Sequence, residues 1–204
     1  MVLEAPLEQT EHGVLPAGEG WFVLNTREAE WRIWAGRGKW PRLEGAAPTF
    51  TQLGVGLTVL DPGEPLSMYH WERDQEGFLV LHGEAIAIVE GEERRLRTWD
   101  FLHCPPGTRH SIVGAGAGRC VIFAVGARQN TMHRTADGRL TSTPDWGAYP
   151  VDEAALRHRA GVEEETSDKS AANPTFAERF STRYRDGWLP DPRPRDSGPG
   201  GRAR

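Results

Sequence analysis

Runs of apolar residues, each closed by turn-forming residues, dominate the pattern along this chain. They recur at a spacing of roughly 8–12 residues, which is typical of strands in a β-sandwich or barrel. Continuous apolar runs indicate strands that are covered on both faces, so two sheets are expected to pack together. The predicted strands are Trp21–Asn25, Leu53–Leu60, Phe78–Leu81, Ala85–Val89, Glu92–Leu96 and Cys120–Val125.

Turn signals fall between these runs. Asp61-Pro62-Gly63 closes one strand, and Pro105-Pro106-Gly107 forms a second turn further along. Glu90-Gly91 separates two strands by only two residues and predicts a tight hairpin. The pattern therefore predicts an all-β fold, and it contains no internal repeat.

The segments that flank the predicted strands have a different composition. Residues 1–20 contain four Glu and no Lys or Arg, which predicts an acidic N-terminal arm. Residues 186–204 contain four Pro and four Gly, which predicts a flexible tail. Between them we expect a barrel at 21–130, with its motif core at 50–126, and a C-terminal extension with short helices at 131–185.

Three short helical patterns are expected outside the strands. Asp152–His158 predicts a helix with Asp152 as its cap. Thr175–Arg185 places apolar side chains at i, i+4 and i+8, which predicts one helix face. Trp31 and Trp34 have the spacing of a shared helix face and are expected to pack on the barrel or on a second subunit.

Composition narrows the function classes. Gly and Pro make up 39 of the 204 residues, which argues against a helical bundle. The net charge of −5, from 24 basic and 29 acidic residues, does not suggest nucleic acid or an anionic membrane as a partner. No apolar run approaches the roughly 18 residues of a membrane helix, and no secretory leader is expected. Two Cys form no disulfide framework, so a cytoplasmic location is the default expectation.

One group of residues in the strand-rich region carries candidate chemistry. His70 and Glu72 are two residues apart, so on a strand they face the same side. A turn at 74–75 then brings Glu76 to the start of the next strand, and His110 follows the turn that contains Pro105 and Pro106. Buried carboxylates without a partner are costly, and a divalent cation is a common remedy. These residues therefore predict a metal site.

Residues 50–126 resemble the cupin family of small β-barrels. The likeness rests on two motifs, and it implies a jelly-roll, double-stranded β-helix fold with short flanking helices. The first motif is matched by Gly63, His70, Glu76 and Gly83, and the second by Pro105, Gly107 and His110. By this resemblance His70, Glu76 and His110 carry over as metal ligands.

The chain departs from the family pattern at several positions, of which Glu72 matters most. It stands where the first motif has a second His, and its carboxylate is a competent ligand. We therefore expect His70, Glu72, Glu76 and His110 to hold one divalent transition metal, with Zn, Fe and Mn all compatible with the donors. Two alternatives stay open: Glu72 contacts the substrate or supports the ligands instead, or the barrel has lost its metal.

Further residues near the motifs are expected around this site. His103 is a candidate for proton transfer because imidazole titrates near neutral pH. Aromatic side chains are candidate cavity walls, although ordinary core packing explains them equally well. The residues assigned to this surrounding shell are His103, Phe78, Trp99 and Phe123.

Three function hypotheses follow. The first is a metal-dependent enzyme that acts on a small molecule as a dioxygenase, isomerase or lyase, because the fold alone does not choose among these reactions. The second is a non-catalytic module that binds a sugar or an acyl compound. The third is a storage-like or structural barrel whose metal only stabilises it. The resemblance also implies a homodimer.

Overall fold

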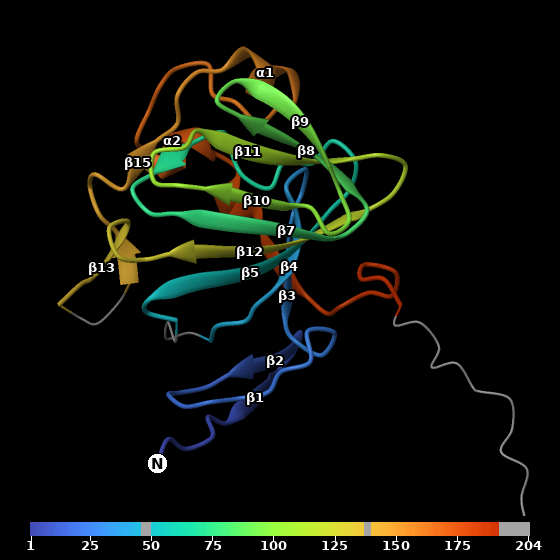
Figure 1. The fold of residues 1–204 in the computed structure, drawn as a ribbon. Helices are drawn as coiled ribbons and strands as arrows, with labels where there is room; N and C mark the ends of the chain where they lie inside the picture. Colours follow the sequence, from blue (N-terminus) through green and yellow to red (C-terminus); the bar gives the residue numbers. More distant parts are fainter. Residues whose placement is uncertain (46–49, 137–139, 192–204) are drawn as a thin grey trace, which may run out of the picture.

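A computed structural model describes residues 1–45, 50–136 and 140–191 of the chain, and its ribbon is shown in Figure 1. The predicted all-β fold is confirmed, since strands dominate and the helices are short. Within the described residues, no helix is long and apolar enough to cross a membrane.

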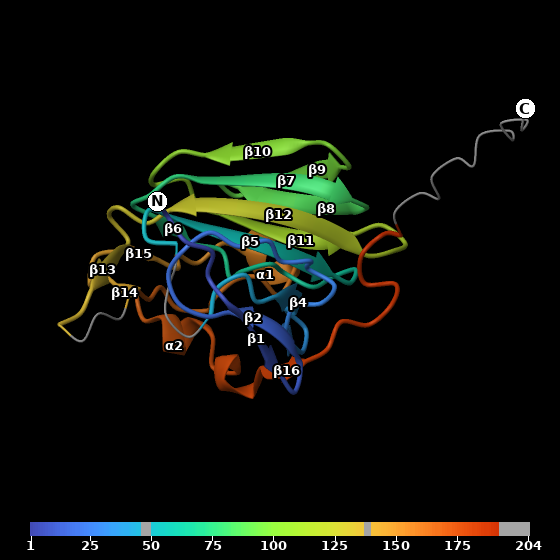
Figure 2. The ribbon, with the colours of Figure 1, turned by 90° about the horizontal axis from the view of Figure 1, so that it is seen from below.

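Two antiparallel sheets form the body of the fold (Figures 1 and 2). The larger has the order β10-β7-β12-β5-β4-β3-β16, and the smaller has the order β11-β8-β9. The strands of the larger sheet are β3 (Trp31–Trp34), β4 (Gly38–Pro41), β5 (Leu53–Leu60), β7 (Glu76–His82), β10 (Phe101–Cys104), β12 (Cys120–Ala127) and β16 (Phe180–Thr182). Those of the smaller sheet are β8 (Glu84–Val89), β9 (Glu92–Arg97) and β11 (His110–Ala115).

Smaller elements flank these sheets. Short strand pairs, two α-helices and one 3-10 turn account for them. They are β1 (Leu7–Thr10) with β2 (Gly13–Pro16), β6 (Trp71–Glu72) with β15 (Gly147–Ala148), β13 (Met132–Arg134) with β14 (Leu140–Ser142), α1 (Glu153–Arg157), α2 (Lys169–Ala172) and η1 (Phe176–Glu178).

The main core lies where the two sheets face each other. Val80 of β7 and Ile122 of β12 pack against Ala87 of β8 and Ile112 of β11, and all four side chains are fully buried. Val59 and Val121 are buried in a second cluster with Trp31, so β5 and β12 are covered on both faces and read as continuous apolar runs in the sequence. The core thus fixes the strands that lead into the candidate site.

The predicted turn and cap signals are confirmed at two places. Glu90 and Gly91 both have positive φ, at 51° and 79°, and join β8 to β9 as the tight hairpin requires. Asp152 caps α1 by accepting a hydrogen bond of 2.9 Å from the backbone N–H of Ala155.

The two helix predictions that involve aromatic spacing are wrong. Trp31 and Trp34 lie on strand β3, and the segment 175–185 forms η1 followed by strand β16. β16 pairs with β3 at the edge of the large sheet, so backbone hydrogen bonding to a neighbour outweighs the helical spacing of the aromatic residues. Trp31 is fully buried and packs on Trp188, with ring centroids 5.1 Å apart.

The segments near the ends of the chain also differ from expectation. Residues 7–16, inside the predicted acidic arm, form the β1–β2 hairpin. Trp21–Asn25 is not a strand and makes only an isolated bridge, from Trp21 to Glu4. Trp188, within the predicted flexible tail, is only 6% exposed because Trp31 covers it. The rest of that tail, 192–204, lies outside the described residues.

Candidate metal centre

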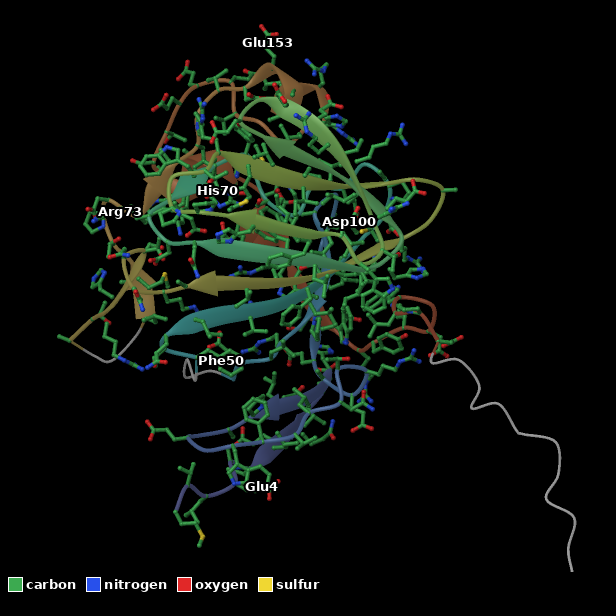
Figure 3. All side chains as sticks on the ribbon, viewed as in Figure 1. Glu4, Phe50, His70, Arg73, Asp100 and Glu153 are labelled. Carbon is green, nitrogen blue, oxygen red and sulfur yellow. The ribbon has the colours of Figure 1, made fainter. Side chains whose placement is uncertain are left out.

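Two histidines are brought together by an isolated backbone bridge between His70, which directly precedes β6, and His110, the first residue of β11. The amide of His110 donates to the carbonyl of His70 at 2.8 Å, and the reciprocal bond measures 3.1 Å. The imidazole centroids are consequently 4.8 Å apart. Figure 3 shows His70 within the body of the fold, whereas Arg73, three residues further along, projects at its edge.

A buried aspartate holds the turn that brings Glu76 beside these histidines. Asp74 is 4% exposed, and its Oδ2 accepts hydrogen bonds from the amide of Thr131 at 2.9 Å and from its hydroxyl at 2.7 Å. The amides of Asn130 add further bonds to the same carboxylate. These bonds lower the pKa of Asp74 despite the opposing effect of burial. The turn then places Glu76 at the first position of β7.

Three donor atoms converge at the centre of this cluster. Oε2 of Glu76 lies 3.0 Å from Nε2 of His110 and 3.6 Å from Nε2 of His70. The ligand atoms of these three residues lie within 4.8 Å of one another. Glu72 stands at the side of this group, with its Oε1 at 3.5 Å from Nε2 of His70. We call His70, Glu76 and His110 the three-residue cluster.

Hydrogen bonds fix the orientation of both imidazoles. Nδ1 of His70 donates to the carbonyl of Met68 at 2.8 Å, and Nδ1 of His110 donates to the carbonyl of Thr108 at 3.0 Å. A carbonyl only accepts, so each Nδ1 carries the proton. In its neutral form, each imidazole therefore directs the lone pair of Nε2 at the centre of the cluster, as metal-binding histidines do.

Without a cation, the side chains of the three-residue cluster shift one another's pKa values. Burial disfavours the charged form of His70, but the contacts with Glu72 and Glu76 outweigh it and raise the pKa to about 10. Burial also disfavours the charged form of His110, but contacts with Cys104 and Glu76 outweigh it and raise the pKa of His110 to about 9. Burial opposes ionisation of Glu76, yet the two imidazoles hold the pKa of that carboxyl well below its usual range. The arrangement favours positive charge at its centre.

The donor set fits a divalent cation. Oε2 of Glu76 and Nε2 of His110 are both buried and make no well-formed hydrogen bond within the described part of the chain. Buried polar atoms seldom lack a partner, and an ion between them would satisfy both. Imidazole nitrogen and carboxylate oxygen are ligands that Zn, Fe and Mn accept.

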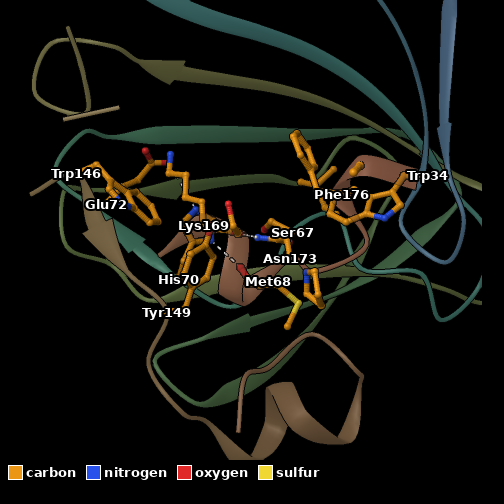
Figure 4. A pocket seen from close by; sticks show the side chains of 14 residues that line it. Trp34, Ser67, Met68, His70, Glu72, Trp146, Tyr149, Lys169, Asn173 and Phe176 are labelled. Carbon is orange, nitrogen blue, oxygen red and sulfur yellow. Dashed lines mark hydrogen bonds and ion pairs between the residues drawn. The ribbon is translucent and has the colours of Figure 1, made fainter. Parts of the chain in front are cut away.

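Two cavities meet at His70. The first, of about 470 Å³, we call the Lys169 pocket; besides His70 its lining includes Trp34, Glu72, Trp146 and Lys169 (Figure 4). The second, of about 370 Å³, we call the Arg37 pocket, and it shares Trp34 and His70 with the first but extends to Arg37, Glu76 and Phe78. A small molecule in either cavity would lie beside the three-residue cluster.

Of the surrounding residues expected from the sequence, the structure places only Phe78 at this site. It is buried, its ring centroid lies 5.3 Å from that of His110, and it lines the Arg37 pocket. His103 is exposed, because its neighbour Cys104 takes the inward position on β10. Phe123 faces outward for the same reason, since Ile122 points into the core. Trp99 is 73% exposed in the turn before β10. None of these three side chains lines a cavity described above.

The C-terminal extension supplies site residues that the sequence analysis missed. The rings of Trp146 and Tyr149 lie 6.1 Å and 5.9 Å from His70, and Lys169 lines the same pocket. They lie dozens of residues beyond the motifs, so local spacing gave no indication of their position. One signal was present: Lys39 and Lys169 are the only lysines in a chain with 24 basic residues.

Part of this chain is similar in sequence to a known protein. A 95-residue segment is 30% identical to gentisate 1,2 dioxygenase 1 of Aquipseudomonas alcaligenes. It covers 47% of this chain but only 27% of that dioxygenase, so the match spans about a quarter of the relative's length.

Solved structures resemble parts of the chain. A sugar phosphate isomerase of the cupin superfamily from Silicibacter pomeroyi is 23% identical, with a TM-score of 0.42, over 53% of this chain and 82% of the other. An RmlC-like cupin from Shewanella frigidimarina is 20% identical, also with a TM-score of 0.42, over 49% and 84%.

The family model for the cupin domain matches residues 56–126. This range contains all four of the predicted ligand positions and both sides of the main core. Residues 56–126 therefore form a cupin domain, and the fold class is the double-stranded β-helix that the sequence motifs predicted.

Proposed function

We propose that this protein is a mononuclear metal-dependent enzyme that acts on a small molecule. The observation that carries the proposal is the convergence of Nε2 of His70, Oε2 of Glu76 and Nε2 of His110 beside two cavities. A polar centre with ligand-type donors at the wall of an apolar pocket is the usual arrangement of an active site.

Among the reaction classes, the donor set favours dioxygenase chemistry. Two His and one carboxylate form the ligand set that non-heme iron(II) oxygenases use. The matched segment of gentisate 1,2 dioxygenase 1 supports the same class. Iron is accordingly the metal we propose, with zinc and manganese as the other ions that these donors accept.

The residues of the site would have distinct roles. His70, Glu76 and His110 would hold the ion, and the backbone carbonyls of Met68 and Thr108 would keep both imidazoles in the correct tautomer. The metal would supply a Lewis acid with exchangeable positions for substrate and dioxygen. Glu72 lines the Lys169 pocket beside His70, where it serves as a fourth ligand or as a contact to the substrate.

Metal content of the purified protein tests this proposal. The protein should contain about one equivalent of metal, whereas His70→Ala and His110→Ala should contain little. His103→Ala is the matched control, because His103 is an exposed histidine of the same domain outside both cavities. If His70→Ala retains as much metal as His103→Ala, the assignment of the site is wrong.

We also propose a homodimer in a reducing compartment. The cupin resemblance suggests the dimer, and Phe101, which is 62% exposed on the edge strand β10, offers apolar surface for it. Cys104 and Cys120 are both buried free thiols, as expected where disulfides do not form. Light scattering in solution tests the dimer, and a monomer at micromolar concentration would contradict it.

A further inference from the structure

Lys169 provides the Lys169 pocket with a cation that the metal centre does not use. It is the first residue of α2, where the N-cap Asp168 accepts a hydrogen bond of 2.8 Å from the amide of Ser170. Its Nζ lies 3.9 Å from the ring centroid of Trp146. Within the described residues, Lys169 forms no ion pair with any carboxylate. The carboxylates of Glu72 and Glu76 interact with this charge without forming an ion pair with it, so a ligand anion can still pair with the ammonium directly.

The charges around the metal site make this lysine significant. Glu72 and Glu76 together carry two negative charges, which neutralise a divalent ion when both imidazoles are neutral. An anionic substrate would then gain little from the net charge of the centre. Lys169 restores a positive charge in the same pocket, which it lines together with Glu72 (Figure 4).

A second cation near the site, Arg37, is less accessible. The guanidinium of Arg37 lies over the ring of Trp34, at 5.4 Å, and its Nη2 donates to the sulfur of Met68. Its Nη1 is buried. Lys169, by contrast, belongs to an exposed residue at the wall of the larger pocket. Lys169 is therefore the more accessible of these two cations.

Two pairs of aromatic side chains contribute to the walls of the pocket. Trp146 and Tyr149 pack with centroids 5.2 Å apart, and Trp34 and Phe176 pack edge to face at 5.2 Å. Figure 4 shows the first pair beside His70 and Lys169 and the second pair at the far end. Such walls favour a flat or apolar body, because aromatic rings pack well in offset and edge-to-face arrangements. The volume of about 470 Å³ suits a small molecule.

We infer that the substrate is a small ring-bearing carboxylate whose carboxylate pairs with Lys169 while its ring lies between the aromatic walls. This inference rests on the proposed function for the position of the reacting centre, and it adds the substrate class. Lys169 acts here as a binding residue that selects the charge of the ligand. Binding orients the ring beside His70 and Glu72, which share the pocket.

Calorimetric titration with two matched probes tests the inference. Benzoate and its neutral counterpart benzamide are titrated into metal-loaded protein, and the metal content of every sample is measured. Benzoate should bind about tenfold more tightly than benzamide, as a charge-assisted hydrogen bond implies. In Lys169→Met the benzoate affinity should fall about tenfold, with benzamide changing less than about twofold. Lys169→Arg should restore most of the preference. Arg95→Met, which removes a charge from an exposed residue of β9, should leave both affinities unchanged.

A second readout locates the probe directly. Reductive methylation with ¹³C-formaldehyde retains the lysine charge and labels Lys39 and Lys169, and Lys169→Arg assigns the Lys169 signal. Lys39 is the internal reference, because it is buried and paired with Asp61 at 2.8 Å. Benzoate should shift the Lys169 signal and leave the Lys39 signal in place.

The two proposals fail in different ways. Equal affinity for benzoate and benzamide, absence of benzoate binding, or an unchanged benzoate affinity in Lys169→Met would overturn the substrate class even if the metal content is normal. Charge-selective binding in a protein that holds no metal at His70 would support the role of Lys169 and overturn the proposed function instead.

Discussion

Nε2 of His110 lies 3.0 Å from Oε2 of Glu76, and both atoms are buried without a well-formed hydrogen bond in the described structure. A buried pair of this kind is costly to keep unless further partners satisfy it. The bridge between His70 and His110 and the turn held by Asp74 nevertheless impose this approach. The fold thus holds ligand atoms together in a geometry that a cation would stabilise.

Metal binding should stabilise the folded protein. A ligand that binds only the native state adds about 2.7 kcal/mol when its concentration is a hundred times the dissociation constant. Adding Fe(II) or Zn(II) to chelator-treated protein should therefore raise the melting temperature in calorimetry. Glu76→Gln should lose this response, since the amide is a poor ligand. An equal rise in Glu76→Gln would show that the stabilising ion binds elsewhere.

Glu72 and Glu76 should differ in their importance for the metal. Only Glu76 belongs to the three-residue cluster, whereas Glu72 contacts His70 from the side. Glu72→Gln should weaken metal affinity by about tenfold, in the range seen when groups that support ligands are changed. Glu76→Gln should abolish stoichiometric binding. Competition titration with a chromophoric chelator measures both, and a larger loss in Glu72→Gln would reverse the assignment.

Asp74 should make stability depend on acid pH. Its pKa is lowered in the folded state, so its contribution is present above the unfolded value, near pH 4, and is lost as pH falls through the folded pKa. Asp74→Asn should cost roughly 1–3 kcal/mol at pH 7, because the amides of Asn130 and Thr131 lose a charged acceptor. Urea denaturation from pH 7 to pH 3 checks this. The difference between the two proteins should shrink toward pH 3, and a constant difference would contradict the role of the charge.

Trp188 should contribute strongly to stability although it lies in a Gly- and Pro-rich segment. It is 6% exposed and packs on Trp31 and Tyr184. Trp188→Ala should destabilise the protein by roughly 3–5 kcal/mol, the usual cost of removing a buried aromatic side chain. Trp99→Ala is the matched control, because Trp99 is 73% exposed and should change stability by less than about 0.5 kcal/mol. Similar effects in chemical denaturation would show that residue 188 is not packed in solution.

The sequence predicts the fold well where hydrogen-bonded strands and hydrophobic burial agree. β5 has the predicted bounds, and the hairpin at Glu90-Gly91 needs only local turn chemistry. The motif spacing likewise brings His70, Glu76 and His110 together, because each follows a turn and begins or precedes a strand. Local rules sufficed for these features.

Prediction fails where long-range pairing decides the structure. The spacing of Phe176 and Phe180 suits a helix, but pairing of β16 with β3 makes Phe180 part of a sheet edge. Lys169 and Trp146 reach the site only through the path of the C-terminal extension, which no local pattern encodes. Neighbouring side chains on a strand point to opposite faces. Ile122 points into the core, so Phe123 must face outward, and the sequence alone did not show which of the two would be buried.

The most direct test of the metal centre is an anomalous difference map from a crystal of the protein loaded with iron or zinc. We expect one strong peak that lies at about 2.0–2.2 Å from Nε2 of His70, Nε2 of His110 and an Oε atom of Glu76. A peak bound by other residues, or a fully loaded crystal without a peak between these three side chains, would contradict it.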